Sequence, residues 1–144
     1  MKVSSLLATK SPTVITIHPD QPVADAVALY GQHNIGSLIV VDRDNRLVGI
    51  LSERDIVRHL PEYDDVMGTA VQEIMTPRVI VALPQDDVMS VAHTMTERRF
   101  RHMPVVDEGE LVGIISIGDI IKYQRDQFRG EIATLETQIM AEKS

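Results

Sequence analysis

An internal duplication with a period of about 65 residues is the feature that most constrains the fold of this chain. Shifting the sequence by 65 residues aligns Val40-Val41-Asp42 with Val105-Val106-Asp107. Beyond the turn that follows, a shift of 64 aligns Leu47-Val48-Gly49-Ile50 with Leu111-Val112-Gly113-Ile114. Other matched pairs are Pro12 and Pro77, Val14 and Val79, Val23 and Val88, Ser52 and Ser116, and Asp55 and Asp119. The shift changes by one residue in a turn, where a change in length is tolerated. The match therefore continues through both segments, and the chain contains two copies of one folding unit.

Each copy is predicted to fold in the order strand, helix, strand, strand, helix. In the first copy, the β-branched residues 14–17 predict a strand, and Asp20 is the expected N-cap of a helix. Residues 37–41 form an apolar run typical of a buried strand, and residues 47–51 pair back as a hairpin. Ser52 is expected to cap the second helix. The expected inward-facing side chains of these helices are Val23, Ala26, Val27, Tyr30, Ile56 and Val57.

The second copy repeats this order. Its strands are predicted at residues 79–82, 103–106 and 111–115, and Ser116 is the expected cap of its last helix. Its first helix is predicted to carry an apolar face made of Val88, Val91, Ala92 and Met95. Between the copies, Thr69-Ala70-Val71-Gln72 matches a capping box at the start of a short helix.

The fold class that follows is α/β. A three-stranded half of about 60 residues covers its core poorly when it is alone, so the two copies are expected to pack together about a pseudo-twofold axis. The expected boundaries are 1–60 for the first repeat, 61–75 for a linker with a short helix, 76–124 for the second repeat and 125–144 for a C-terminal amphipathic helix.

The tail beyond the repeats carries a helical apolar stripe. Its members, separated by seven, four, three and four residues, are Ile121, Phe128, Ile132, Leu135 and Ile139. These spacings place all five on one side of a helix. The stripe either packs on the chain's own domain or contacts a second copy or another protein, and two heptads are too few to decide.

Composition and charge exclude several classes of function. The net charge of −7 argues against a nucleic-acid-binding surface. The absence of cysteine excludes disulfides, thiolate zinc sites and a cysteine nucleophile. No apolar run approaches the roughly 18 residues of a membrane span and no signal-peptide core develops, so we expect a cytoplasmic protein. The histidines show no metal-ligand spacing, and no phosphate loop or dinucleotide fingerprint occurs. We therefore expect no metal, no catalytic cofactor and no enzymatic activity.

The duplicated segments resemble the cystathionine-β-synthase (CBS) domain pair over about residues 1 to 124. The first copy carries the resemblance in residues 37–42 and in the segment Gly49-Ile50-Leu51-Ser52-Glu53-Arg54-Asp55. The second copy carries it in residues 101–107 and in Gly113-Ile114-Ile115-Ser116-Ile117-Gly118-Asp119. One Ser-x-x-Asp motif would be a weak signal, but its duplication at matching places is a strong one. The resemblance implies two clefts between the repeats that hold adenosine-containing ligands, and a flat homodimer formed through helices.

The resemblance also implies roles for particular residues. Asp55 and Asp119 would accept hydrogen bonds from ribose hydroxyls, while Ser52 and Ser116 would lie near phosphate. Helix N-termini at these serines favour anions independently of the resemblance. The other expected ligand contacts are Val14, Leu38, Val79 and Met103 around the adenine, and Ser37, Arg54, Arg101, His102 and Pro104 along the cleft. Because the first repeat has Gly36-Ser37 where the second has Arg101-His102, the two sites are expected to differ in ligand or occupancy.

Each of these features also has a purely structural interpretation. Ser-x-x-Asp at a helix start is an ordinary cap, and the segment from Arg98 to His102 could be a solvated basic turn. The expected function is a regulatory module that binds an adenine nucleotide (AMP before ADP and ATP) and acts on an unknown regulated protein. Two alternatives stay open at this point: a sensor of NAD(H) or S-adenosylmethionine, and a structural interaction module with empty clefts. A nucleotide hydrolase is disfavoured, and it predicts release of phosphate from ATP.

Overall fold

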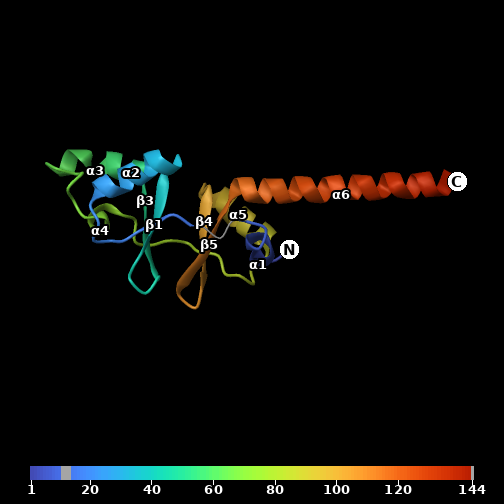
Figure 1. The fold of residues 1–144 in the computed structure, drawn as a ribbon, viewed down its shortest axis with the longest axis horizontal. Helices are drawn as coiled ribbons and strands as arrows, with labels where there is room; N and C mark the ends of the chain where they lie inside the picture. Colours follow the sequence, from blue (N-terminus) through green and yellow to red (C-terminus); the bar gives the residue numbers. More distant parts are fainter. Residues whose placement is uncertain (11–13, 144) are drawn as a thin grey trace.

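The computed structural model describes residues 1–10 and 14–143, with side chains up to Ala133 and at Leu135. In chain order the elements are α1 (Val3–Leu7), β1 (Thr16–Ile17), α2 (Val23–His33), β2 (Ser37–Val41), β3 (Leu47–Ser52), α3 (Glu53–His59), η1 (Leu60–Glu62), α4 (Val71–Ile74), α5 (Val88–Arg98), β4 (His102–Asp107), β5 (Glu110–Ser116) and α6 (Ile117–Lys143). The two repeats lie side by side, and α6 projects away from them (Figure 1). Pro12 and the side chain of Ile139, both used above, lie outside the described residues.

Both predicted hairpins form. β2 pairs antiparallel with β3, and β4 pairs antiparallel with β5. Each hairpin has a register irregularity at the same place, between Val40 and Val41 in one and between Val105 and Val106 in the other. The first repeat adds β1 as a parallel strand beside β2. The duplication seen in the sequence is therefore present in the structure as well.

The sheet of the second repeat has only two strands, so the strand predicted at residues 79–82 is wrong. Only Ala82 pairs with β4: its N–H donates to the Pro104 carbonyl (2.9 Å) and its carbonyl accepts from the Val106 N–H (3.0 Å). Pro84, two residues further on, has no N–H with which to extend the pairing forward, and Pro104 on β4 has none with which to extend it back. In the first repeat the strand predicted at residues 14–17 is also shorter, since β1 contains only Thr16 and Ile17.

Three aliphatic clusters form the core. One belongs to the first repeat, around Leu38 and Leu51, and one to the second, around Met103 and Ile115. A third, containing Ile39, Val41 and Leu111 with Val14 packed against it, joins the two sheets. At the hairpin tips, the Leu111 N–H donates to the Asn45 carbonyl at 3.1 Å, and the tips are adjacent in Figure 1. The expected packing of the two copies against each other is thus confirmed.

Two helix caps were predicted wrongly, and for a common reason. α2 has no side-chain cap, so Asp20 does not cap it; its Val23 N–H donates to the Thr69 carbonyl at 2.8 Å. α4 likewise lacks the predicted capping box at Thr69, and its Val71 N–H donates to the Gln21 carbonyl at 2.8 Å. The loops before these helices therefore cap each other with backbone carbonyls, which satisfies the free N–H groups of a first turn.

The N-terminal helix α1 packs on the second repeat. Val3 and Leu6 are buried in the core cluster of that repeat. Leu7 lies over Gly113, where an added Cβ would come within 2.8 Å of a Leu7 methyl group. α4 covers the first repeat in the same way, with Met75 over Gly49. α1 and α4 are thus equivalent covers of the two hairpins.

Several helix side chains face outward instead of inward. Tyr30, Val91 and Met95 are buried as predicted, but Val27 is 37% and Val57 63% exposed, so the predicted inward orientation of these two valines is wrong. α2 packs on its sheet through residues three and four apart, Val23, Ala26 and Tyr30, which leaves Val27 at the edge of the contact. Along α6 the side chains that pack on the second repeat are Ile117, Ile120 and Tyr123, in the first two turns, whereas Ile121, Phe128, Ile132 and Leu135 are exposed. The four stripe members whose side chains the structure describes therefore do not pack on their own domain.

Substitution of Gly49 by alanine is expected to destabilise the fold by about 1–3 kcal/mol through overpacking. The added Cβ would lie 2.6 Å from the Met75 sulfur and 2.9 Å from the Thr76 carbonyl oxygen, and the latter is backbone that cannot turn aside. Gly31→Ala is the control, because nothing lies within 4 Å of its added Cβ and alanine favours a helix by about 0.5–1 kcal/mol over glycine. Urea denaturation should therefore give changes of opposite sign, and equal midpoints would contradict this account.

Candidate functional site

The first Ser-x-x-Asp motif forms a capping box at the junction of β3 and α3. The Asp55 N–H donates to Ser52 Oγ at 3.2 Å, and the Ser52 N–H donates to Asp55 Oδ2 at 2.9 Å. Ser52 takes this position because it ends β3 in an extended conformation, and the predicted cap is confirmed. Asp55 is only 9% exposed and is the one charged residue that is buried within the described part of the chain. A largely buried carboxylate thus lies at the start of α3.

Thr76 completes the surroundings of this carboxylate, and the sequence analysis missed it. Its hydroxyl donates to Asp55 Oδ1 at 3.2 Å. Its backbone is fixed by two hydrogen bonds with Ile50, of 2.9 and 2.8 Å. Gly49 allows this close approach, because a side chain there would meet the Thr76 carbonyl. A glycine in a strand is a known sign of close backbone approach, and it is the signal that could have found Thr76.

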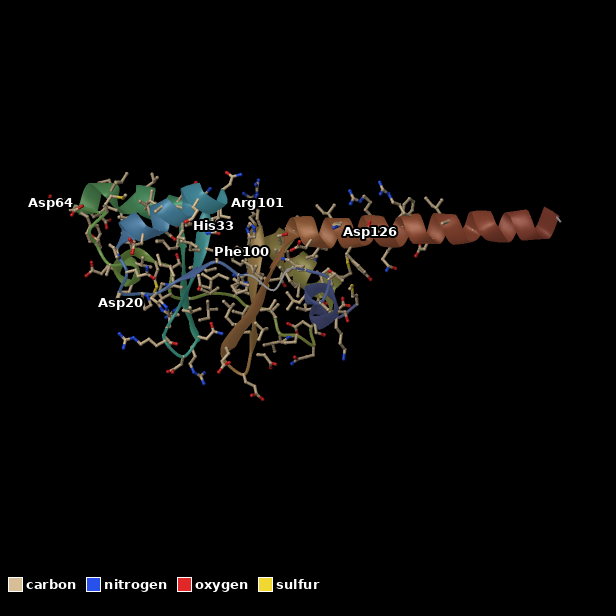
Figure 2. All side chains as sticks on the ribbon, viewed as in Figure 1. Asp20, His33, Asp64, Phe100, Arg101 and Asp126 are labelled. Carbon is tan, nitrogen blue, oxygen red and sulfur yellow. The ribbon has the colours of Figure 1, made fainter. Side chains whose placement is uncertain are left out.

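The motif opens into a cleft of about 870 Å³ formed by both repeats. The first repeat contributes the start of β2, the end of β3 and the start of α3. The second contributes the segment after α4 and the segment between α5 and β4, where Figure 2 labels Phe100 and Arg101. Eight residues predicted from sequence line this cleft: Ser37, Ser52, Arg54, Asp55, Val79, Arg101, His102 and Pro104. The lining residues not in the predicted set are Gly36, Ile50, Glu53, Thr76, Arg78, Ile80, Arg98, Arg99 and Phe100.

Five predicted site residues lie elsewhere. Leu38 and Met103 are 1% and 2% exposed and belong to the repeat cores. Side chains alternate between the faces of a strand, so His102 and Pro104 line the cleft while Met103 between them points into the core. Val14 packs in the cluster between the sheets. Ser116 and Asp119 form a separate motif at the start of α6.

Positive charge dominates the cleft. Its lining contains five arginines but only two carboxylates, those of Glu53 and Asp55. No ion pair among the described residues engages any of these arginines, which are Arg54, Arg78, Arg98, Arg99 and Arg101. Arg99 has a φ of 60° at the end of α5, a left-handed conformation that suits glycine or asparagine better. The cleft therefore concentrates cations on a protein that is acidic as a whole.

His102 connects the cleft to the second motif. It lines the cleft and is the register partner of Ser116 across the β4–β5 hairpin. Desolvation lowers the pKa of His102, and the charges of Lys10 and Arg101 lower it further against the opposing effect of Asp119. His102 is therefore neutral near pH 7 in the free protein.

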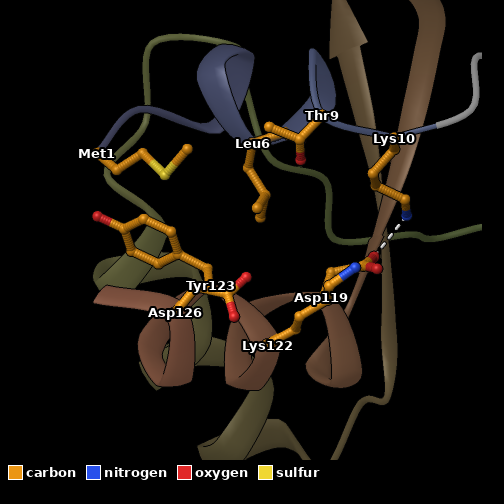
Figure 3. Close-up of a pocket in the computed structure, with 8 residues that line it drawn as sticks. All are labelled: Met1, Leu6, Thr9, Lys10, Asp119, Lys122, Tyr123 and Asp126. Atoms are coloured by element: carbon orange, nitrogen blue, oxygen red, sulfur yellow. Dashed lines mark hydrogen bonds and ion pairs between the residues drawn. The ribbon is translucent and has the colours of Figure 1, made fainter. Parts of the chain in front are cut away.

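The second motif has the same cap but a different surrounding. The Asp119 N–H donates to Ser116 Oγ at 3.0 Å, and the Ser116 N–H donates to Asp119 Oδ2 at 2.9 Å. Lys10 Nζ lies 2.5 Å from Asp119 Oδ2 (Figure 3). Desolvation alone would raise the pKa of Asp119, but the bonds from Lys10 and Ser116 outweigh it and hold this pKa below its usual value. The cavity here measures about 190 Å³.

Within residues 1–10 and 14–143, no group of three or more His, Asp or Glu side chains could hold a metal ion. No helix of the described chain combines the length and apolar character needed to cross a membrane. The groups that could recognise a ligand lie in the cleft, which has a buried carboxylate that can accept hydroxyl hydrogen bonds, apolar walls and a group of cations.

Comparison with known proteins identifies the family of this chain. The sequence matches the CBS domain family over residues 3–62 and 71–126. An uncharacterised 17.7 kDa protein of Acidianus ambivalens is 36% identical over 122 residues, which cover 84% of this chain and 71% of that protein. Across five curated relatives, the aligned part spans between 35% and 84% of their length.

Solved structures with the same fold include ligand complexes. The CBS domain pair of protein MJ0100, in complex with 5′-methylthioadenosine and S-adenosyl-L-methionine, has a TM-score of 0.72 and 30% identity, over 88% of this chain and 98% of that one. The CBSX2 protein in complex with AMP has a TM-score of 0.75 and 26% identity, over 87% and 96% of the two chains. With both repeats matched and the paired fold shared, the chain belongs to the CBS domain family and is a pair of CBS domains followed by a long C-terminal helix.

Proposed function

We propose that this protein is a regulatory module that binds an adenine nucleotide in the cleft between its repeats, without catalysing a reaction, in the cytoplasm. AMP is the favoured ligand, followed by ADP and ATP. The observation that carries the proposal is the juxtaposition of a buried carboxylate, Asp55, with five arginines from both repeats around one cleft. The adenosine-containing ligands in the MJ0100 and CBSX2 complexes support the ligand class.

The cleft offers one surface for each part of the ligand. Asp55 accepts a hydrogen bond from the Thr76 hydroxyl and can also accept hydrogen bonds from a ribose diol. Apolar side chains suited to a base are Ile50, Val79, Ile80 and Pro104. Phosphate groups would meet Arg54 and Arg101, whose guanidinium forks favour an anion.

Arg101 provides a physical route from the cleft to α6. Its side chain lines the cleft, while its carbonyl accepts a hydrogen bond of 2.9 Å from the N–H of Ile117, the first residue of α6. A nucleotide that binds more tightly to one position of Arg101 would shift the equilibrium at the root of α6. The exposed stripe of Phe128, Ile132 and Leu135 is then the surface that contacts a regulated protein. α6 would lay this apolar face into a groove of that protein.

Homodimerisation is proposed through the faces of the repeat helices rather than through the tail. Val27 and Val57 of the first repeat are exposed, and so are Met89 and Ile121 of the second. Val57 and Ile121 occupy equivalent places in the two copies. A groove between α2 and α3 of about 490 Å³ runs beside both valines. An apolar surface present on both copies suits a symmetric contact.

Val57→Asp is expected to convert the dimer into a monomer while leaving the fold intact, because Val57 is 63% exposed and a substitution at such a site changes stability little. Light scattering coupled to size exclusion measures the mass directly. Val112→Asp is the control: it makes the same change on β5 at a side chain that is 48% exposed. Equal masses for both variants would reject the proposed dimer surface.

Nucleotide affinity is expected to rise as pH falls from about 7.5 to 6. The pKa of His102 is lowered in the free protein, and a phosphate group beside it favours the charged imidazolium. Binding then takes up a proton, so lower pH favours the complex. Titration calorimetry at both pH values tests this, and His102→Gln should flatten the dependence. An affinity in the wild type that is independent of pH would contradict phosphate contact at His102.

A thermal-shift panel with AMP, ADP, ATP, NAD(H) and S-adenosylmethionine tests the proposal as a whole. A ligand at 100 times its dissociation constant stabilises the fold by about 2.7 kcal/mol. Arg54→Ala is expected to reduce the shift, whereas Arg58→Ala, on the same helix but outside the cleft lining, should not. No shift with any ligand would favour a structural module with empty clefts, and release of phosphate from ATP would favour a hydrolase.

A further inference from the structure

The two Ser-x-x-Asp motifs differ in what covers the carboxylate. In the first, Asp55 receives a neutral hydroxyl from Thr76 at 3.2 Å. In the second, the Lys10 ammonium group lies 2.5 Å from Asp119 Oδ2 and also donates to the Ile114 carbonyl at 2.7 Å. The ammonium group is thus held at two points.

Lys10 reaches this place through a local insertion. Leu7 and Met75 cover equivalent glycines, Gly113 and Gly49. Five positions separate Leu7 from Pro12, but two separate Met75 from Pro77, so the N-terminal segment has three extra residues, 8–10. Lys10 is the last of these. The segment from Leu7 to Pro12 therefore carries a cation, Lys10, that the equivalent segment from Met75 to Pro77 lacks.

The charge near Asp119 also differs from that near Asp55. The sequence counterparts of the cleft residues Arg54, Arg99 and Arg101 are Gly118, Asn34 and Gly36, none of which is charged. A nucleotide at Asp119 would thus lack three of the cations that surround Asp55, and it would meet a carboxylate that Lys10 already engages.

We propose that Lys10 closes the second of the duplicated sites by occupying Asp119, so that each chain binds a single adenine nucleotide, at Asp55. This inference rests on the proposed function of the Asp55 cleft. A ribose diol needs the carboxylate oxygens as acceptors, and it must displace an ammonium group that is anchored on both a carboxylate and a carbonyl. Lys10 is therefore the residue that sets occupancy.

Titration calorimetry with adenosine tests the proposal, because adenosine needs no phosphate contacts. Wild-type protein and Lys10→Arg, which keeps the charge, are expected to bind one adenosine per chain. Lys10→Ala is expected to bind two, and Lys10→Ala with Asp119→Ala to return to one. Two sites in the wild type, or one site in Lys10→Ala, would overturn the proposal.

A measurement without nucleotide separates the failure of this inference from that of the proposed function. Because Lys10 holds the pKa of the Asp119 carboxyl low, Lys10→Ala is expected to raise that pKa in an NMR titration of the carboxyl carbons. An unchanged pKa would overturn the closure by Lys10 whatever the nucleotide does. A raised pKa together with no adenosine binding in any variant would overturn the proposed function, and the single-site inference with it.

Discussion

Asp55→Ala is expected to lower the affinity for AMP and ATP at least about 100-fold, since it removes two hydrogen bonds to a charged acceptor, each contributing about 1.5–3 kcal/mol. It also removes the carboxylate that accepts from the Ser52 N–H in the capping box of α3 and from Thr76, so a loss of about 1–2 kcal/mol in unfolding free energy is expected as well. Titration calorimetry measures the first effect and urea denaturation the second. The two must be separated, because a partly unfolded protein also binds poorly.

Asp87→Ala separates them. Asp87 caps α5 by accepting from the Met89 and Ser90 N–H groups at 3.1 and 3.2 Å, and it lies outside the cleft lining. This variant should lose comparable stability and keep its nucleotide affinity. If Asp55→Ala and Asp87→Ala weaken binding equally, the effect of Asp55 is one of stability, and its proposed contact with ribose is wrong.

The double variant Arg99→Asn with Arg101→Ala is expected to lose about 100-fold in affinity for AMP and ATP while its affinity for adenosine stays unchanged. Both arginines line the cleft without an ion-pair partner among the described residues. Each charged hydrogen bond to phosphate is worth about 1.5–3 kcal/mol. Asparagine is the counterpart residue in the first repeat, Asn34, where it adopts a similar positive φ of 53°.

The substitution Arg99→Asn also has an expected effect on stability. A left-handed conformation costs a non-glycine residue roughly 1–2 kcal/mol, and asparagine tolerates it better than arginine. Thermal unfolding without ligand should therefore show no destabilisation from Arg99→Asn. Arg43→Ala with Arg58→Ala is the control, because it removes the same charge from outside the cleft. Equal loss of ATP affinity in both double variants would indicate a general effect of net charge rather than contact with phosphate.

The sequence predicted the parts of the fold that depend on local patterns. The hairpins of residues 37–52 and 102–116 follow from apolar runs around short turns, and the Ser52 cap follows from the residue type at a helix start. The duplication strengthened each prediction, because the same pattern occurs in both copies and predicts the same element in each. Eight of the residues that the resemblance to CBS domains implied line the cleft.

The features that the sequence did not reveal depend on contacts between distant segments. The capping of α2 and α4 by each other's loops replaces side-chain caps that local rules predicted at Asp20 and Thr69. Leu38 and Met103 were assigned to the base by analogy, but strand alternation turns them into the cores. The pairing of Lys10 with Asp119 joins residues 109 positions apart, and no local pattern indicates it.

The most direct test of the central claim is a two-dimensional amide NMR titration of the isotope-labelled protein with AMP and, separately, with adenosine. Binding in the cleft between the repeats predicts shifts in amides of both copies, concentrated in residues 36–37, 50–55, 76–80 and 98–104. The amides beside Asp119 should move less than those beside Asp55. Shifts confined to one repeat, or the absence of any shift at saturating nucleotide, would contradict a shared nucleotide site.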